Sequence, residues 1–301
     1  MNNHPLPFRP APRAERFLPT AAGNVKKLLF ALVAALLLSG AQAEAKRCGY
    51  WLHGKNMKDV DVRALAALGT TDVFLNEYAF TAHGRKDVAS WIAKAHEAGL
   101  DIHVWMQAFY NGKWINPVKD GVPDAGLFDE KIARALTYAR MRGVAGIHFD
   151  YVRYPGTAYK TSGGADAVSE FVRQAATRLH KASPRIVVSV ALMPETTSSL
   201  RYYGQDYAVI SQYMDVVLPM IYKGNYKQTT PWIASTTAWY VKNSKGAKVW
   251  SGLQGYKSDE DTSPLPLQEI AADAESALKA GAAGIVIFRW GVANLIPFRK
   301  D

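Results

Sequence analysis

The chain has 301 residues, of which 49% are apolar and 21% are charged, with a formal net charge of +10. This composition excludes a collagen-like or largely disordered chain and provides enough apolar material for a large core. The single cysteine, Cys48, excludes an internal disulfide and a cysteine-rich metal cluster. Length alone allows one domain or two.

The first 43 residues have the pattern of a secretory signal peptide with an upstream extension. Lys26 and Lys27 form a basic region, residues 28–38 are an unbroken apolar run, and Ala43 ends an Ala-x-Ala cleavage pattern. The run is too short to span a bilayer. We therefore expect a secreted or periplasmic domain, residues 44–301, without a stable membrane anchor.

Removal of residues 1–43 takes away five basic residues and one acidic residue, which lowers the net charge to +6. A modest positive charge on an exported protein favours acidic partners such as polyanionic glycans. We expect no nucleic-acid partner.

Short β-rich runs alternate with longer helical stretches throughout the remaining 258 residues. The predicted strands are 48–54, 72–80, 101–110, 145–153, 186–194, 215–223, 248–256 and 283–291. The predicted helices are 60–68, 86–98, 129–141, 166–181, 200–214, 231–242 and 266–280, and an eighth is absent or short. Strict alternation implies a parallel sheet, and eight units match a (β/α)8 barrel, which needs ~250 residues. An open doubly wound sheet is the alternative, but no Gly-rich phosphate turn follows the first strand.

Alternate side chains of a strand share a face, so the last inward residue of each strand can be predicted. These residues are His53, Asn76 or Glu77, Gln107, Asp150, Glu195, Tyr222, Gln254 and Trp290, and His148 shares the face of Asp150. Strand ends supply catalytic groups in this fold. The set contains carboxylates, amides and aromatic rings, but no phosphate-binding group and no lysine suited to form a Schiff base. It therefore fits a polyhydroxylated substrate, with two carboxylates as acid and as base or nucleophile.

Asp150 is the first candidate for a catalytic carboxylate, and a structural pair with Arg153 or His148 is the alternative. Glu195, on the next strand, could form a closely spaced retaining pair with Asp150, whereas Glu77 across the mouth would suit an inverting geometry. Arg153 is either a clamp for a substrate carboxylate or the counter-charge of Asp150. This chemistry requires no metal and no cofactor.

The string from Gly146 to Pro155, Gly-Ile-His-Phe-Asp-Tyr-Val-Arg-Tyr-Pro, resembles the signature that closes strand four in uncharacterised glycosyl-hydrolase-like barrel families. Met220-Ile221-Tyr222 and Trp290 are more distantly similar to strands six and eight of the chitinase-like family 18 of glycoside hydrolases. Asp150 matches the last Asp of that family's strand-four motif, but its catalytic Glu is Val152 here. The resemblance implies a barrel that hydrolyses glycosidic bonds in a poly- or oligosaccharide, without substrate-assisted chitinase chemistry.

Two other functions remain open from the sequence. His53, His103, His148 and Asp150 could converge on a divalent metal in a hydrolase or deacetylase. Alternatively, a non-catalytic carbohydrate-binding barrel would keep the aromatic residues and lose the paired acids. The long predicted loops 111–128 and 156–165 contain or adjoin Tyr110, Trp114, Tyr154 and Tyr159, whose rings suit stacking on sugars or packing within the loops.

Overall fold

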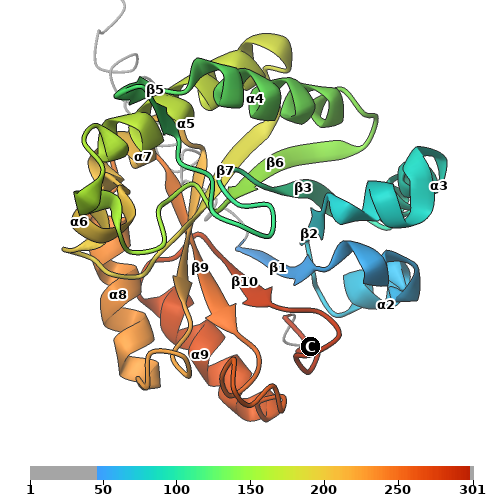
Figure 1. The fold of residues 1–301 in the computed structure, drawn as a ribbon. Helices are drawn as coiled ribbons and strands as arrows, with labels where there is room; N and C mark the ends of the chain where they lie inside the picture. The colour runs from blue at the N-terminus through green and yellow to red at the C-terminus, as the bar shows by residue number, and fades with distance from the viewer. Residues whose placement is uncertain (1–45, 299–301) are drawn as a thin grey trace, which may run out of the picture. The chain divides into compact units, whose positions relative to one another are not determined.

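A computed structural model describes residues 46–298, so the predicted signal peptide lies outside the described residues. Eight parallel strands close into a barrel in the order β1-β10-β9-β8-β7-β6-β3-β2, with helices around it (Figure 1). The strands are β1 (Arg47–Leu52), β2 (Asp72–Asn76), β3 (Asp101–Gln107), β6 (Val144–Asp150), β7 (Val187–Leu192), β8 (Val216–Ile221), β9 (Lys248–Gln254) and β10 (Gly284–Phe288). The predicted (β/α)8 barrel is confirmed.

The helices follow the predicted order with local differences. They are η1 (Gly54–Asp59), α2 (Val62–Ala67), α3 (Tyr78–Glu97), α4 (Ala125–Ala139), η2 (Ala158–Lys160), α5 (Gly164–Ala182), α6 (Ser199–Tyr203), α7 (Tyr207–Tyr213), α8 (Thr230–Asn243) and α9 (Leu267–Lys279). A small hairpin, β4 (Val118–Lys119) and β5 (Val122–Pro123), lies in the loop after β3. Among the described residues, no helix follows β10.

Two predicted elements differ from the structure for local reasons. The predicted strand 72–80 ends at Asn76, whose side-chain Oδ1 accepts a hydrogen bond from the Tyr78 backbone N–H at the start of α3. The predicted helix 200–214 is two helices, because Gly204 takes a φ of 74° after α6. Asp206 then caps α7 by accepting hydrogen bonds from two backbone N–H groups.

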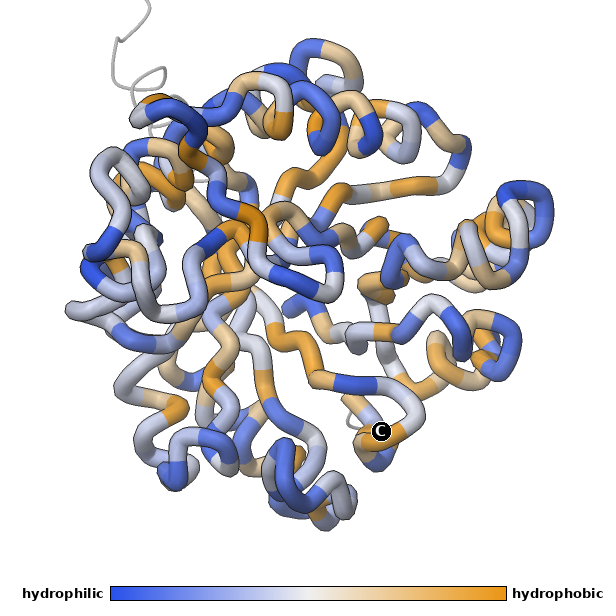
Figure 2. The backbone as a smooth tube through the Cα atoms, viewed as in Figure 1, coloured by the Kyte–Doolittle hydropathy of each residue, from blue (hydrophilic) through white to orange (hydrophobic). Residues whose placement is uncertain are grey.

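The core has an outer layer between strands and helices and a smaller cluster inside the barrel. The inner cluster consists of Trp51, Phe74, Trp105, Val216, Leu218, Trp250 and Val286. Ile102, Val104 and Met106 of β3 belong to the outer layer, as their alternation with Trp105 predicts. Apolar segments lie along the strands and polar ones along the outer helices (Figure 2). The interior is therefore packed with rings below the mouth.

The end of the barrel opposite the mouth is held by a buried polar network. The Asp72 carboxylate accepts hydrogen bonds from Arg47 at 2.7 Å and contacts His103 Nε2 at 2.9 Å. The His103 ring stacks on Phe74, with the ring centroids 4.5 Å apart. His103 is thus fixed at the floor of the barrel.

Gly146→Ala is expected to lower the free energy of unfolding by about 1–3 kcal/mol, because the new Cβ would overpack the floor. It would lie 2.1 Å from His103 Nδ1 and 2.9 Å from the Val187 carbonyl oxygen. Thermal unfolding of Gly126→Ala is the control, since its Cβ would meet only Asp124 Oδ1, at 3.4 Å. An unchanged Tm for Gly146→Ala would contradict this account of the floor.

Candidate active site

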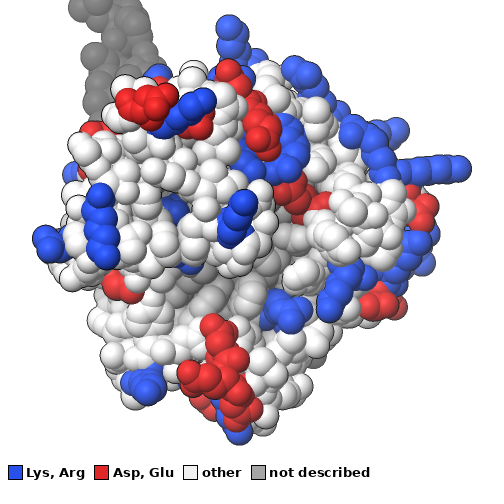
Figure 3. Space-filling view, viewed as in Figure 1, with Lys and Arg blue, Asp and Glu red and all other residues white. Residues whose placement is uncertain are grey.

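A pocket of about 620 Å³ opens at the carboxyl ends of the barrel strands. The space-filling view shows a hollow at the centre of this face, with charged groups of both signs around it (Figure 3). Four residues predicted from the strand ends line it, namely His53, Gln107, Asp150 and Tyr222, and so does Arg153, which was predicted beside Asp150. Several other lining residues were not predicted as site residues from the sequence, among them Tyr151, Met193, Asn225, Tyr226, Tyr256, Asp259, Phe288 and Arg289.

Asp150 ends β6 and presents its carboxylate to the pocket while being only 9% exposed. One oxygen accepts a hydrogen bond from Trp105 Nε1 at 3.1 Å, and the other accepts one from the Tyr151 backbone N–H at 2.6 Å. Neither Arg153 nor His148 forms an ion pair with it among the described residues. Burial raises the pKa of Asp150, and the two hydrogen bonds and the charge of Arg153 partly oppose that rise.

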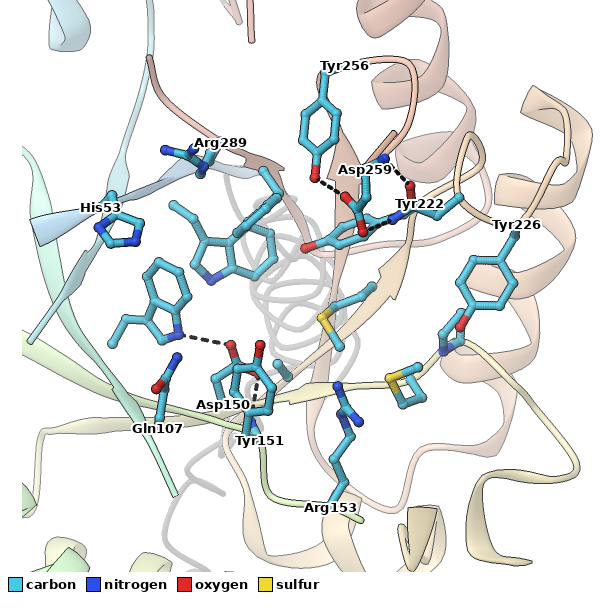
Figure 4. Close-up of a pocket in the computed structure, with 18 residues that line it drawn as sticks. His53, Gln107, Asp150, Tyr151, Arg153, Tyr222, Tyr226, Tyr256, Asp259 and Arg289 are labelled. Carbon is cyan, nitrogen blue, oxygen red and sulfur yellow. Dashed lines mark hydrogen bonds between the residues drawn. The ribbon is translucent and has the colours of Figure 1, made fainter. Parts of the chain in front are cut away.

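Asp259 is a second carboxylate in the same pocket and comes from the loop between β9 and α9. Its carboxylate accepts hydrogen bonds from the Tyr256 hydroxyl at 2.7 Å and from Asn225 Nδ2 at 2.9 Å. Its backbone N–H donates to Asn225 Oδ1 at 2.9 Å, so the loop and the side chain are both fixed. Asp150 and Asp259 lie on different sides of the pocket, with Tyr222 between them (Figure 4).

Glu195, the first predicted partner of Asp150, lines an adjoining cavity of about 270 Å³. Its Oε1 accepts hydrogen bonds from the Tyr203 and Tyr226 hydroxyls, both at 2.9 Å. Its Oε2 is buried without a hydrogen-bond partner. Pro194 and Tyr226 line both cavities, so Glu195 lies next to the main pocket rather than in it.

Glu77, the other predicted partner, lies outside the pocket lining. Its carboxylate contacts Arg134 Nε at 3.3 Å and accepts a hydrogen bond from the Tyr138 hydroxyl at 3.2 Å, and both partners belong to α4. Burial raises the pKa of Glu77, and Arg134 and Tyr138 oppose the rise. The neighbouring Asn76 is buried and serves the start of α3. The structure therefore does not bring Glu77 or Asn76 to Asp150 in one lining.

Three further residues predicted for substrate binding also lie outside the pocket lining. His148 is fully buried beneath it, with Nδ1 2.9 Å from Ser189 Oγ, and burial keeps its pKa well below the usual value. Gln254 is buried, and its Oε1 accepts hydrogen bonds from the backbone of Gly224 and Asn225. Trp290 follows the end of β10 and packs on the outer core, so Phe288 is the last inward ring of that strand.

The remaining predicted residues form the walls of the pocket. Gln107 is the register partner of Asp150 on the adjacent strand β3. Burial lowers the pKa of His53, and the charges of Arg289 and Lys55 lower it further. Tyr222 stacks on Phe288 with the ring centroids 5.6 Å apart, and burial with nearby acids raises its pKa well above normal. The pocket thus combines aromatic faces with groups that can hydrogen-bond to hydroxyls.

The loop aromatics divide between the pocket rim and other places. Trp114 and Tyr110 pack with Tyr151 at the rim, with Tyr110 and Tyr151 stacked at 4.7 Å. Tyr154 is buried and donates a hydrogen bond to Asn116. Tyr159 is 53% exposed and contacts Tyr202 away from the pocket lining.

The metal-site hypothesis lacks a cluster of ligands in the described part of the chain. Residues 46–298 contain no group of three or more His, Cys, Asp or Glu side chains that could hold a metal ion. His103 is bound to Asp72 at the floor and His148 to Ser189 below the pocket, so neither converges with His53 on Asp150. The arrangement instead offers two carboxylates in one ring-lined cavity.

Comparisons with known proteins agree on the fold and on one family. Residues 79–246, more than half of the chain, match the family model DUF4015, described as "Putative glycosyl hydrolase domain". No curated protein matches the chain significantly.

Solved structures of glycoside hydrolases share the barrel. A class V chitinase from Pseudomonas fluorescens Pf-5 has a TM-score of 0.62 at 14% identity, covering 83% of this chain and 96% of its own. A family 18 chitinase from Cycas revoluta, in complex with (GlcNAc)3, has a TM-score of 0.61 at 11% identity, with 81% and 95% covered. An endo-β-1,4-mannanase from Thermotoga petrophila has a TM-score of 0.59 at 11% identity, with 86% and 70% covered. At these identities the likeness is one of fold.

Proposed function

We propose that this chain, which belongs to the DUF4015 family of putative glycosyl hydrolase domains, is an exported enzyme. The enzyme cleaves glycosidic bonds in a poly- or oligosaccharide. The family match confirms the resemblance carried by the string from Gly146 to Pro155. The observation that carries the mechanism is the presence of Asp150 and Asp259 in one pocket lined by aromatic rings.

The two carboxylates have surroundings that suit different roles. Asp150 is buried, and its raised pKa favours the protonated form that a general acid needs to protonate the leaving oxygen. Asp259 is exposed, and hydrogen bonds from Tyr256 and Asn225 fix its orientation. A carboxylate that activates water as a base, or attacks as a nucleophile, requires such an orientation. We propose Asp259 as the partner of Asp150 in place of Glu195 or Glu77, because it alone among these three lines the same pocket.

The pocket chemistry supports a sugar polymer as the substrate. Rings such as Tyr151, Tyr226 and Tyr256 can stack on sugar faces, while Gln107 and Asn225 can exchange hydrogen bonds with hydroxyls. The Glu of the chitinase motif is Val152, which is buried and does not line the pocket. The proposed chemistry therefore differs from that of substrate-assisted chitinases. The basic charge of residues 44–301 favours an acidic glycan.

Export is proposed from the signal-peptide pattern of residues 1–43. Within residues 46–298, none of the helices has the length and apolar character that crossing a membrane requires. To test this proposal, the chain including residues 1–43 is expressed in a bacterial host and the cells are fractionated. Mass spectrometry of the product then identifies its N-terminal residue. Retention of the whole chain in the cytoplasm would contradict it.

The hydrolase itself is tested with purified protein on a panel of neutral, amino and acidic glycans, with new reducing ends as the readout. Hydrolysis of at least one glycan, lost in the Asp150→Asn variant, is the expected result. Binding without turnover across the panel would favour the non-catalytic carbohydrate-binding barrel instead. Activity that a chelator removes and a divalent metal restores would favour a metal-dependent hydrolase.

A further inference from the structure

Arg153 lines the pocket as a half-buried cation without a carboxylate partner. Its Nη1 donates a hydrogen bond to the Tyr154 carbonyl oxygen at 3.2 Å, and its Nε is buried without a hydrogen-bond partner. Among the described residues Arg153 forms no ion pair. It nevertheless lies close enough to Asp150 for its positive charge to oppose the rise in the pKa of that carboxyl. Withdrawing a guanidinium from water without a counter-charge is costly, so its position points to an anion that arrives with the substrate.

Three aromatic rings hold this guanidinium in place. The Arg153 Cζ atom lies 4.9 Å from the ring centroid of Trp114, 5.2 Å from that of Tyr151 and 5.7 Å from that of Tyr203. Tyr151 is itself stacked on Tyr110. Cation–π contacts fix a planar guanidinium while leaving its edge free to donate two parallel hydrogen bonds. We refer to Trp114, Tyr151 and Tyr203 as the aromatic cage.

The cage directs the cation toward the place where the substrate would lie. In Figure 4 the side chain of Arg153 extends from its strand-end loop toward the centre of the pocket, near Asp150. Arg289 lines the opposite side, beside His53, and has no ion pair among the described residues either. Asp259, the other acid of the pocket, is engaged by Tyr256 and Asn225 instead. The cationic edge of Arg153 is therefore available to a ligand.

We propose that Arg153 binds the carboxylate of an acidic sugar unit, so that the substrate is a glycan containing uronic acids. This inference rests on the proposed hydrolase function and specifies its substrate class. A bidentate guanidinium–carboxylate pair explains why a planar arginine occupies the cage. Arg153 is then a specificity-determining residue that contacts the substrate beside the reacting acid.

The test measures binding to the whole protein carrying Asp150→Asn, which prevents turnover. The probes are trigalacturonate and triglucuronate, each compared with its own methyl ester, in which every carboxyl carries a methyl group and no charge. Calorimetry is expected to show at least one acid form binding about tenfold to a hundredfold more tightly than its ester. Arg153→Gln should abolish that difference, and Arg153→Lys should restore part of it, because lysine returns the charge without the fork.

Arg201→Gln is the matched control. Arg201 also lies over two rings, 5.3 Å from the centroid of Tyr159 and 5.8 Å from that of Tyr202, but it is outside the pocket lining. Its loss removes one positive charge and should leave the preference for the acid unchanged. Equal binding of acid and ester, no binding of either acid, or an acid preference retained in Arg153→Gln would each overturn the proposal.

The outcomes separate this inference from the proposed function. Cleavage of neutral glycans with no preference for an acid would overturn the role of Arg153 and leave the hydrolase standing. Arg153-dependent binding of an acid, without cleavage of any glycan in the panel, would support the carboxylate site and overturn the hydrolase.

Discussion

Asp150→Asn is expected to lower kcat/KM by about 10²–10⁴-fold, the contribution typical of a positioned general acid. Asn keeps the size of the side chain but cannot deliver a proton to the leaving oxygen. The carboxyl lines the pocket, and Trp105 and the Tyr151 backbone fix its orientation. The measurement is steady-state hydrolysis of the glycan identified in the panel, with circular dichroism to confirm the native fold. Full activity in a folded variant would remove Asp150 from the mechanism.

The pH profile is expected to follow the protonation of the same carboxyl. Because burial raises the pKa of Asp150 above its ordinary value of 3.8, the protonated acid persists to higher pH than it would on an exposed aspartate. Activity should therefore fall as the pH rises through this raised pKa. The hydrogen bond from Trp105 Nε1 favours the charged form, so Trp105→Phe should move the alkaline limb to higher pH. A limb that stays in place, or activity that increases with ionisation of Asp150, would contradict the acid role.

Asp259→Asn is expected to cost about 10²–10⁴-fold in kcat/KM, because it removes the base or nucleophile while keeping the shape of the side chain. Glu195→Gln and Glu77→Gln are the matched controls. Each removes one carboxylate charge, but Glu195 lines the adjoining cavity and Glu77 pairs with Arg134. Both should retain most of the activity.

The same kinetic series decides between the three acids. A large loss in Glu195→Gln with little effect in Asp259→Asn would restore the pair on adjacent strands. NMR of the first-formed anomer then establishes whether the acid pair retains or inverts configuration, a choice that the sequence leaves open.

The barrel could be predicted because its signals are local and repeated. Short β-rich runs alternate with longer helical stretches along the sequence, and this alternation specifies the parallel sheet. The period of two also placed the side chains of β3 and β6, where Gln107 and Asp150 are register partners at the pocket. The pairing of β3 with β6 is regular from His103 and Gly146 to the pocket, beyond a register shift at Ile102, so the period of two holds there.

Most other site residues lie in loops or beyond the ends of strands, where side chains do not alternate between two faces. Asp259 lies in a loop, where no alternation indicates direction, and only the loop's position after a strand marks it as a candidate. Glu77 leaves the predicted face because the chain turns into α3 directly after Asn76. Trp290 leaves it because β10 ends at Phe288. The sequence also does not show that three rings from separate segments surround Arg153, because these rings come together only in the folded chain.

Asp150 and Arg153 lie three residues apart on one segment, which is anchored by the Tyr154 backbone N–H donating to the Tyr203 carbonyl oxygen at 3.0 Å. If Arg153 binds the charged sugar and Asp150 protonates the glycosidic oxygen, the scissile bond must lie a fixed number of sugar units from the charged one. Digestion would then yield a narrow set of fragments, whose new chain ends all have the same charged neighbour at the same position.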